Sequence, residues 1–259
     1  MAYGLGLVGL RHDVDTVLGL LLGVERVVGI EDRFDARSTF YVRLRVVKKL
    51  GRRGVRLLER LVDDGWRVGL HIDNTVDHPS LASPWHELLA FEELLGVRVS
   101  TATIYGGLFG GEKRWLLSKL CSLGRPVLNV EGPGFCLSIP TVTLDWIVAR
   151  GGRSASEAAL QRLLGVSGAG LPVAVLTHPE YFVVSVGARF TLGARAYSVK
   201  TRVLKLAEKA LIPLYTMAGR RLVSEPYRRL LAALRDMGYR LVHMEGLVES
   251  VYGVDLLHA

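Results

Sequence analysis

Cysteine and the side-chain amides are the residues that this sequence has least of. Its 259 residues include two cysteines, Cys121 and Cys136, with no C-x-x-C spacing, which excludes a cysteine-built zinc site and a disulfide-rich secreted scaffold. One Gln and two Asn beside abundant Arg are typical of proteins from very hot environments. Both cysteines are expected to be buried thiols, and a disulfide stays open as the alternative in such an organism.

Long apolar runs are missing as well. No stretch of about 18 residues is free of charge and glycine, and the longest candidate, residues 17–30, contains Glu25 and Arg26. The first ten residues carry neither the basic segment nor the cleavage site of a signal peptide. We therefore expect a cytoplasmic protein without a membrane segment.

Positive charge is abundant, with a formal net charge of +8 at pH 7. Residues 43–56 contain seven cations: Arg43, Arg45, Lys48, Lys49, Arg52, Arg53 and Arg56. No aromatic residue is interleaved to stack bases, and no helix-turn-helix, RNA-recognition or KH signature occurs, so a nucleic-acid partner is disfavoured. A solvated surface is the preferred interpretation of this stretch, and a patch for an anionic substrate is the alternative.

Short β-branched runs alternate with longer amphipathic stretches, which predicts parallel strands joined by crossover helices. Strands are expected at 6–12, 38–42, 67–72, 100–104, 127–130, 172–177 and 240–243, and helices at 16–29, 54–64, 84–95, 112–123, 154–164 and 225–237. Seven strands predict an α/β fold, a distorted (β/α)7-type barrel. No repeat or linker divides the chain, so residues 1–259 are expected to form a single domain. Residues 182–217 exceed an ordinary connection and are expected to form an inserted lid or interface arm.

Three groups of ionisable residues follow apolar runs. They are Arg11-His12-Asp13-Val14-Asp15, then His71-Ile72-Asp73 with Asp77-His78 close behind, then His178-Pro179-Glu180. Catalytic side chains of parallel barrels gather at the carboxyl ends of the strands, so the groups are predicted to meet. Side chains alternate along a strand, which places Asp13 and Asp15 on the face of Arg11 and His12 on the other. For the first group alone the alternative is structural: Arg11 pairs with the aspartates, and Asp15 caps the next helix.

Carboxylate and imidazole together suit zinc, manganese and similar ions. Two carboxylates close together can also divide their roles, one binding a cation and one acting as a base. The sequence therefore predicts a site that binds a divalent metal ion.

The order and spacing of these motifs resemble the polysaccharide-deacetylase (NodB-homology) superfamily, and in particular its divergent branch that begins with R-H-D-V-D. The likeness spans most of the chain. Its motifs are Arg11 to Asp15, the second strand at 36–42, the segment 65–71 ending in His71, the strand-end His178 and the closing helix and strand at 230–244.

This resemblance implies hydrolysis of an N-acyl group with one divalent metal ion, zinc by preference and manganese, nickel or cobalt as alternatives. By position, it implies that Asp13 is the general base and His178 the acid, and that Asp15 and His71 are metal ligands. Arg11, Asp73 and Glu180 are expected to contact the substrate, a small molecule or oligosaccharide, anionic in one interpretation. A homo-oligomer is left open.

Three departures from the family pattern stand out. The position of its second metal histidine is Thr75 here, so His78, or else Asp73, would take that place. Residues 105–111 lack the family's arginine, so Arg11 or Arg114 would orient the base. Val14 separates two aspartates that are adjacent in the common form.

Two other classes of protein remain as alternatives. A phosphoesterase-like metallohydrolase would use the same residue types with two metal ions about 4 Å apart. A non-catalytic ligand-binding barrel would keep only remnants of the site.

Overall fold

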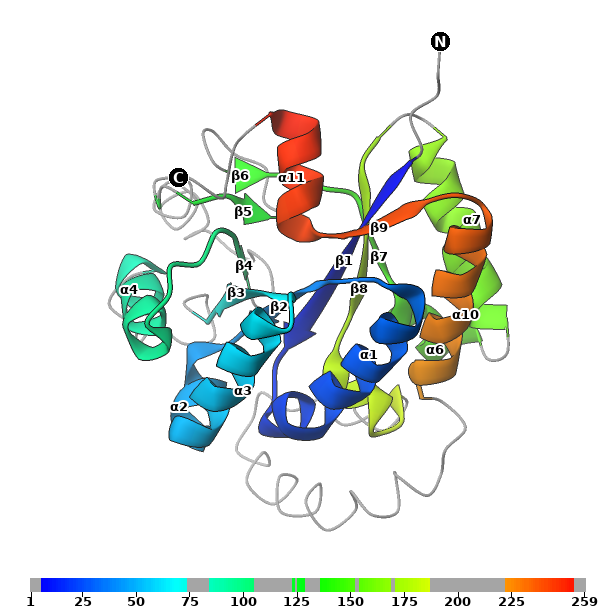
Figure 1. The fold of residues 1–259 in the computed structure, drawn as a ribbon. Helices are drawn as coiled ribbons and strands as arrows, with labels where there is room; N and C mark the ends of the chain where they lie inside the picture. Colours follow the sequence, from blue (N-terminus) through cyan, green and yellow to red (C-terminus); the bar gives the residue numbers. More distant parts are fainter. Residues whose placement is uncertain are drawn as a thin grey trace, which may run out of the picture.

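The computed structural model describes residues 6–73, 84–104, 123, 125–128, 136–151, 154–168, 171–186 and 222–253. Nine parallel strands of this part form one sheet in the order β6-β5-β4-β3-β2-β1-β8-β7, with β9 also on β1. The strands are β1 (Leu7–Val14), β2 (Thr39–Val42), β3 (Arg67–Ile72), β4 (Ala102–Ile104), β5 (Val127–Leu128), β6 (Cys136–Leu137), β7 (Thr141–Thr143), β8 (Val173–Thr177) and β9 (Arg240–His243). The sheet is curled into a half-barrel (Figure 1), which confirms the predicted distorted (β/α)7-type fold.

Strand β1 is the centre of the sheet and pairs with three strands. β8 pairs with it along Val8–His12, β9 along Leu7–Leu10 and β2 along Arg11–Val14. Since β8 occupies one edge of β1, β9 and β2 follow one another along the other edge. β9 therefore lies beside the start of β1, and β2 lies beside its end.

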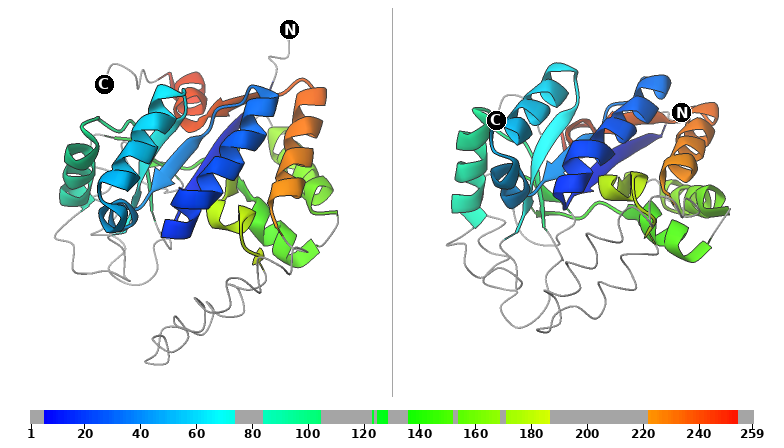
Figure 2. Two further views of the ribbon diagram at one scale, coloured as in Figure 1. Left: turned by 60° about the horizontal axis from the view of Figure 1, so that its bottom comes forward. Right: turned by 90° about the horizontal axis from the view of Figure 1, so that it is seen from below.

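Helices cover the outer face of the sheet, except α11 (Met244–Tyr252), which packs on the opposite face in a second cluster with Tyr41 and Ala174. The covering helices are α1 (Val24–Glu31), α2 (Leu44–Leu50), α3 (Arg52–Asp63), α4 (Pro84–Leu95), α6 (Leu144–Gly151), α7 (Ala155–Ser167) and α10 (Ser224–Asp236). Figure 2 shows α3, α1 and α10 side by side across the sheet. Their buried apolar residues lie at helical spacing, for example Leu230, Leu231 and Leu234 of α10, and pack on the strands to form the main core.

Glu31, at the end of α1, is a fully buried carboxylate that ties this helical layer to the sheet. Four side chains hydrogen-bond to it: His12 Nε2 (2.8 Å), Ser38 Oγ (2.8 Å), Trp66 Nε1 (2.6 Å) and Tyr227 OH (2.7 Å). His12 Nδ1 lies 2.6 Å from Thr177 Oγ1, and its ring stacks on Phe40. His12 therefore belongs to the helix-covered core, on the face that alternation predicted.

Gly23 allows a close approach that positions the segment after β8. It lies in a π-helical turn (Gly19–Gly23) that precedes α1 and packs on a 3-10 turn, Pro179–Phe182. A Cβ at Gly23 would lie 2.2 Å from the carbonyl oxygen of Pro179. Only glycine fits this contact, which fixes the chain directly after His178.

The predicted elements are largely confirmed, with differences at short ones. β3, β9 and α4 have the predicted limits, whereas α2, α6, α11, β6 and β7 were not predicted. Cys136 forms a disulfide and is not the free thiol that was expected. Most of the predicted helix at 112–123 and residues 187–217 of the predicted lid lie outside the described residues, and the single-domain organisation stays a prediction. No described helix is both long and apolar enough to span a bilayer.

Candidate active site

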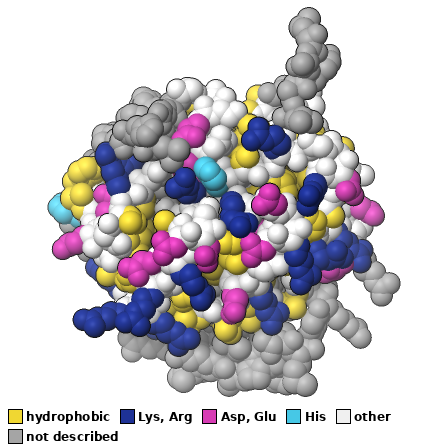
Figure 3. Space-filling model, in the orientation of Figure 1, with side chains coloured by type: hydrophobic (Ala, Val, Ile, Leu, Met, Phe, Trp, Pro, Cys, Tyr) yellow, Lys and Arg dark blue, Asp and Glu magenta, His cyan; other side chains and the backbone are white. Residues whose placement is uncertain are grey.

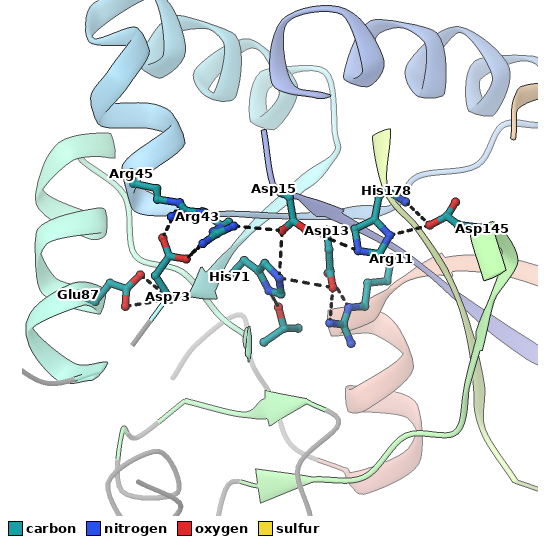
Figure 4. A network of polar contacts seen from close by, with 11 residues as sticks. Arg11, Asp13, Asp15, Arg43, Arg45, His71, Asp73, Glu87, Asp145 and His178 are labelled. Atoms are coloured by element: carbon teal, nitrogen blue, oxygen red, sulfur yellow. Dashed lines mark hydrogen bonds and ion pairs between the residues drawn. The ribbon is translucent and has the colours of Figure 1, made fainter. Parts of the chain in front are cut away.

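Asp15 is the centre of the polar cluster at the carboxyl ends of the strands (Figure 4). Its Oδ1 lies 3.5 Å from His71 Nε2, near the end of β3, and its Oδ2 lies 3.9 Å from His178 Nε2, directly after β8. Asp13 Oδ2 is 3.8 Å from the same nitrogen of His71. The structure thus brings four of the predicted site residues together from three parallel strands.

Asp13 is held by Arg11 of the same strand. Arg11 Nε donates to Asp13 Oδ1 at 2.8 Å and Arg11 Nη2 donates to Asp13 Oδ2 at 2.7 Å, with both residues 3% exposed. Burial acts to raise the pKa of Asp13, but the charge and hydrogen bonds of Arg11, with His71, lower it to about 2. Asp13 is therefore ionised at neutral pH. Of the two arginines expected to orient it, Arg11 makes the contact, and Arg114 lies outside the described residues.

His71 is buried and neutral. Burial lowers its pKa to about 4, and the negative charge of Asp13 opposes this only in part. Its Nδ1 lies 2.6 Å from Thr103 Oγ1 on β4, a hydroxyl that can donate or accept, and its Nε2 faces Asp13 and Asp15. A proton on Nδ1 would leave the lone pair of Nε2 directed at these carboxylates. This is the protonation state in which an imidazole can bind a metal ion.

His178 pairs with Asp145, a residue that the sequence analysis missed. Asp145 Oδ2 accepts from His178 Nδ1 at 2.6 Å and from the His178 backbone N–H at 2.9 Å. Burial opposes protonation of His178, but the hydrogen bond and charge of Asp145, with Asp15, raise its pKa to about 10. His178 is therefore protonated at neutral pH, and its side chain, 19% exposed, is more accessible than those of Asp13, Asp15 and His71.

The signal for Asp145 was short. Asp145 is the second residue of α6, and this helix starts directly after Thr141-Val142-Thr143, whose β-branched residues form the three-residue strand β7. The same reasoning that singled out the ends of the longer strands would have singled it out, had β7 been recognised.

A second group lies beside Asp15. Arg43, the residue after β2, is fully buried, forms an ion pair with Asp73 and places Nη1 4.0 Å from Asp15 Oδ1. Arg45 Nε lies 3.4 Å from Asp73 Oδ2, and the Asp73 backbone N–H points to both oxygens of Glu87, at 2.9 and 3.1 Å. The preferred interpretation of residues 43–56 as a solvated surface is thus wrong for Arg43.

The other cations of that stretch do lie at the surface. Lys48, Lys49, Arg52, Arg53 and Arg56 are exposed on α2 and α3, and Figure 3 shows Lys and Arg side chains gathered at the lower left, where Figure 1 places these helices. Glu180, expected to contact the substrate, is 2% exposed in the turn after His178, and that role stays a prediction.

Asp15 and His71 supply two donors of the kind that bind a divalent cation. Asp15 and the neutral His71 present oxygen and nitrogen lone pairs across 3.5 Å, and these are ligand types for zinc and related ions. Within the described residues, no three His, Cys, Asp or Glu side chains form a group that could hold a metal ion. His78, the predicted further ligand, lies outside that part of the chain.

Solved structures that the chain resembles in fold include deacetylases and a pseudoenzyme, although the sequence itself matches no family model and no curated protein. The chain is similar to the Xyl-CE4 domain of a multidomain xylanase from the hindgut metagenome of Trinervitermes trinervoides (13% identity, TM-score 0.56, covering 96% of this chain and 92% of that one). It is also similar to the peptidoglycan deacetylase PdaC of Bacillus subtilis (15%, 0.54, 96% and 93%). A third is BA3943 of Bacillus anthracis, a CE4 family pseudoenzyme (18%, 0.54, 95% and 66%).

Proposed function

Since the chain has the fold of the CE4 polysaccharide-deacetylase superfamily, we propose that it hydrolyses the N-acyl group of a sugar or a related compound. The observation that carries this proposal is the pair of opposite protonation states around Asp15. Asp13 is ionised, with a pKa of about 2, and His178 is protonated, with a pKa of about 10. Amide hydrolysis needs both a proton acceptor for water and a proton donor for the leaving nitrogen.

Each residue of the cluster has a distinct role in this proposal. Asp13, oriented by the two hydrogen bonds from Arg11, accepts a proton from the attacking water. His178 Nε2 donates a proton to the departing amine, while Asp145 holds Nδ1 and stabilises the imidazolium. Asp15 and His71 would hold the divalent cation, zinc by preference. Such an ion lowers the pKa of water and polarises the amide carbonyl, so a carboxylate as weakly basic as Asp13 suffices.

The substrate class follows from the neighbours and from the surface. A peptidoglycan deacetylase and a xylanase-associated domain share the fold, which supports an N-acylated oligosaccharide. The exposed cations of α2 and α3 support the narrower alternative of an anionic one.

Acetate release from N-acetylated oligosaccharides, measured with the metal-loaded protein, tests this function. Asp13→Asn removes the proton acceptor but neither proposed metal ligand, so we expect turnover to fall by at least about a hundredfold while one metal ion per chain remains bound. Asp63→Asn on the exposed surface of α3 is the matched control and should keep full activity. Loss of bound metal in Asp13→Asn would instead mean that Asp13 is a ligand.

A non-catalytic ligand-binding barrel is the second candidate. Two observations favour it: the described residues lack a complete metal-binding group, and a CE4 pseudoenzyme is among the similar structures. Metal content separates the candidates, because one ion per chain supports a deacetylase, two support a phosphoesterase-like enzyme and none supports a binding protein.

A further inference from the structure

Arg43 is a buried charge that the proposed mechanism does not use. Its side chain is fully buried, its guanidinium forms an ion pair with Asp73, and its Nη1 lies 4.0 Å from Asp15 Oδ1. The same oxygen of Asp15 faces His71 Nε2 at 3.5 Å. The oxygen best placed to bind a metal ion together with His71 therefore already lies beside a permanent cation (Figure 4).

The register of the sheet enforces this arrangement. Val42 of β2 pairs with Val14 of β1 on one side and with Leu70 of β3 on the other. The residues that follow these three are Asp15, Arg43 and His71, so the carboxylate, the guanidinium and the imidazole lie in a row at the end of three adjacent strands. The position of Arg43 thus follows from the pairing of the strands.

The partner of Arg43 is equally well fixed. The carboxylate of Asp73 forms ion pairs with Arg43, at the end of β2, and with Arg45 of α2. Its backbone N–H donates a hydrogen bond to Glu87 of α4. Two helices and two strands therefore hold one carboxylate against the guanidinium. An arginine on a flexible surface segment would not have such support.

We propose that Arg43 is an internal cation that competes with a divalent metal ion for Asp15, and that Asp73 moderates this competition. Positive charges a few ångströms apart in a buried site repel strongly, and arginine cannot relieve the repulsion by losing its proton. The pair thereby sets the metal affinity of the site. This inference rests on the proposed function only in taking Asp15 and His71 as metal ligands.

Calorimetric titration of the metal-free protein with Zn²⁺ and with Mn²⁺ tests it, because the two partners should act in opposite directions. Arg43→Gln removes the competing charge and should tighten binding by about tenfold or more, whereas Asp73→Asn leaves Arg43 unopposed and should weaken binding by a similar factor. A merely structural pair would give losses in both variants, since each leaves a buried charge without its partner.

Two further variants keep the test decisive if one of the single variants folds poorly. Arg43→Lys preserves the charge and should bind within about threefold of the unmodified protein. The double variant Arg43→Gln/Asp73→Asn leaves no charge unpaired, and its affinity should fall between those of the two single variants. Arg56→Gln changes the net charge on the exposed part of α3 and should leave binding unchanged.

The proposal is overturned if Arg43→Gln binds the metal ion no more tightly than the unmodified protein does. It is also overturned if neither protein binds the metal ion. The protein could release no acetate and still bind a metal ion more tightly in Arg43→Gln and not at all in Asp15→Asn. That result would refute the proposed function and support the role of Arg43.

Discussion

Replacing Glu31 tests the physical basis of the fold around the site. This buried carboxylate accepts hydrogen bonds from four side chains on β1, the start of β2, the start of β3 and α10. Leucine fills a similar volume but accepts none, so Glu31→Leu removes the shared acceptor of four buried groups, of which only His12 Nε2 and Tyr227 OH, 3.4 Å apart, can pair with each other. An orphaned buried donor costs about 1–3 kcal/mol, and partial rearrangement reduces the sum, so we expect a loss of about 4 kcal/mol in the free energy of unfolding.

Urea denaturation followed by circular dichroism measures this loss. Trp66→Phe is the graded comparison, because it removes a single hydrogen bond, from Trp66 Nε1 to Glu31 Oε2 at 2.6 Å, and should cost about 1–2 kcal/mol. A loss below about 1 kcal/mol in Glu31→Leu would refute the assignment of this carboxylate as the organising group between helices and sheet.

Two further variants probe the packing and the buried charges. Gly23→Ala places a Cβ 2.2 Å from the Pro179 carbonyl oxygen and should lower the free energy of unfolding, measured by thermal denaturation, by about 2–3 kcal/mol. Gly29→Ala is the control, because a Cβ there has nothing within 4 Å, and it should be neutral or stabilising. Equal effects of the two variants would contradict the close contact at Gly23. Burial of Glu245 raises its pKa, but hydrogen bonds from His243 and Thr39 outweigh this and hold it below the ordinary 4.5. Its stabilising contribution is therefore present above pH 4.5 and is lost as the pH falls through the lower, folded-state pKa. Glu245→Gln should flatten the stability profile on the acid side, and an unchanged profile would show that Glu245 does not supply it.

The sequence predicted those features of the fold that depend on residues close together in the chain. The alternation in β1 placed Arg11 and Asp13 on one face and His12 on the other, as their contacts require. Strand-end positions singled out His71 and His178 without any knowledge of their partners. These residues could be found because each lies at the end of an apolar run that is visible in the sequence.

The partners of those residues were not found in the same way. In the sequence, Arg43 could not be distinguished from the other six cations of residues 43–56. Its burial depends on the register between β2 and its two neighbouring strands. Asp145 depends on the pairing of β7 with β8, which brings it beside His178. Contacts between strands distant in sequence, rather than the residues themselves, give both side chains their place in the site.

The pairing of β9 with the first half of β1 also has a consequence for how the protein folds. Leu7 lies opposite Arg240 and Leu10 opposite His243, so the strand that carries Asp13 is completed by a segment far from it in the sequence. Contacts between such distant segments form slowly, because a long loop must close before they contribute any stability. The candidate active site is therefore expected to assemble late in folding, after β9 has paired with β1.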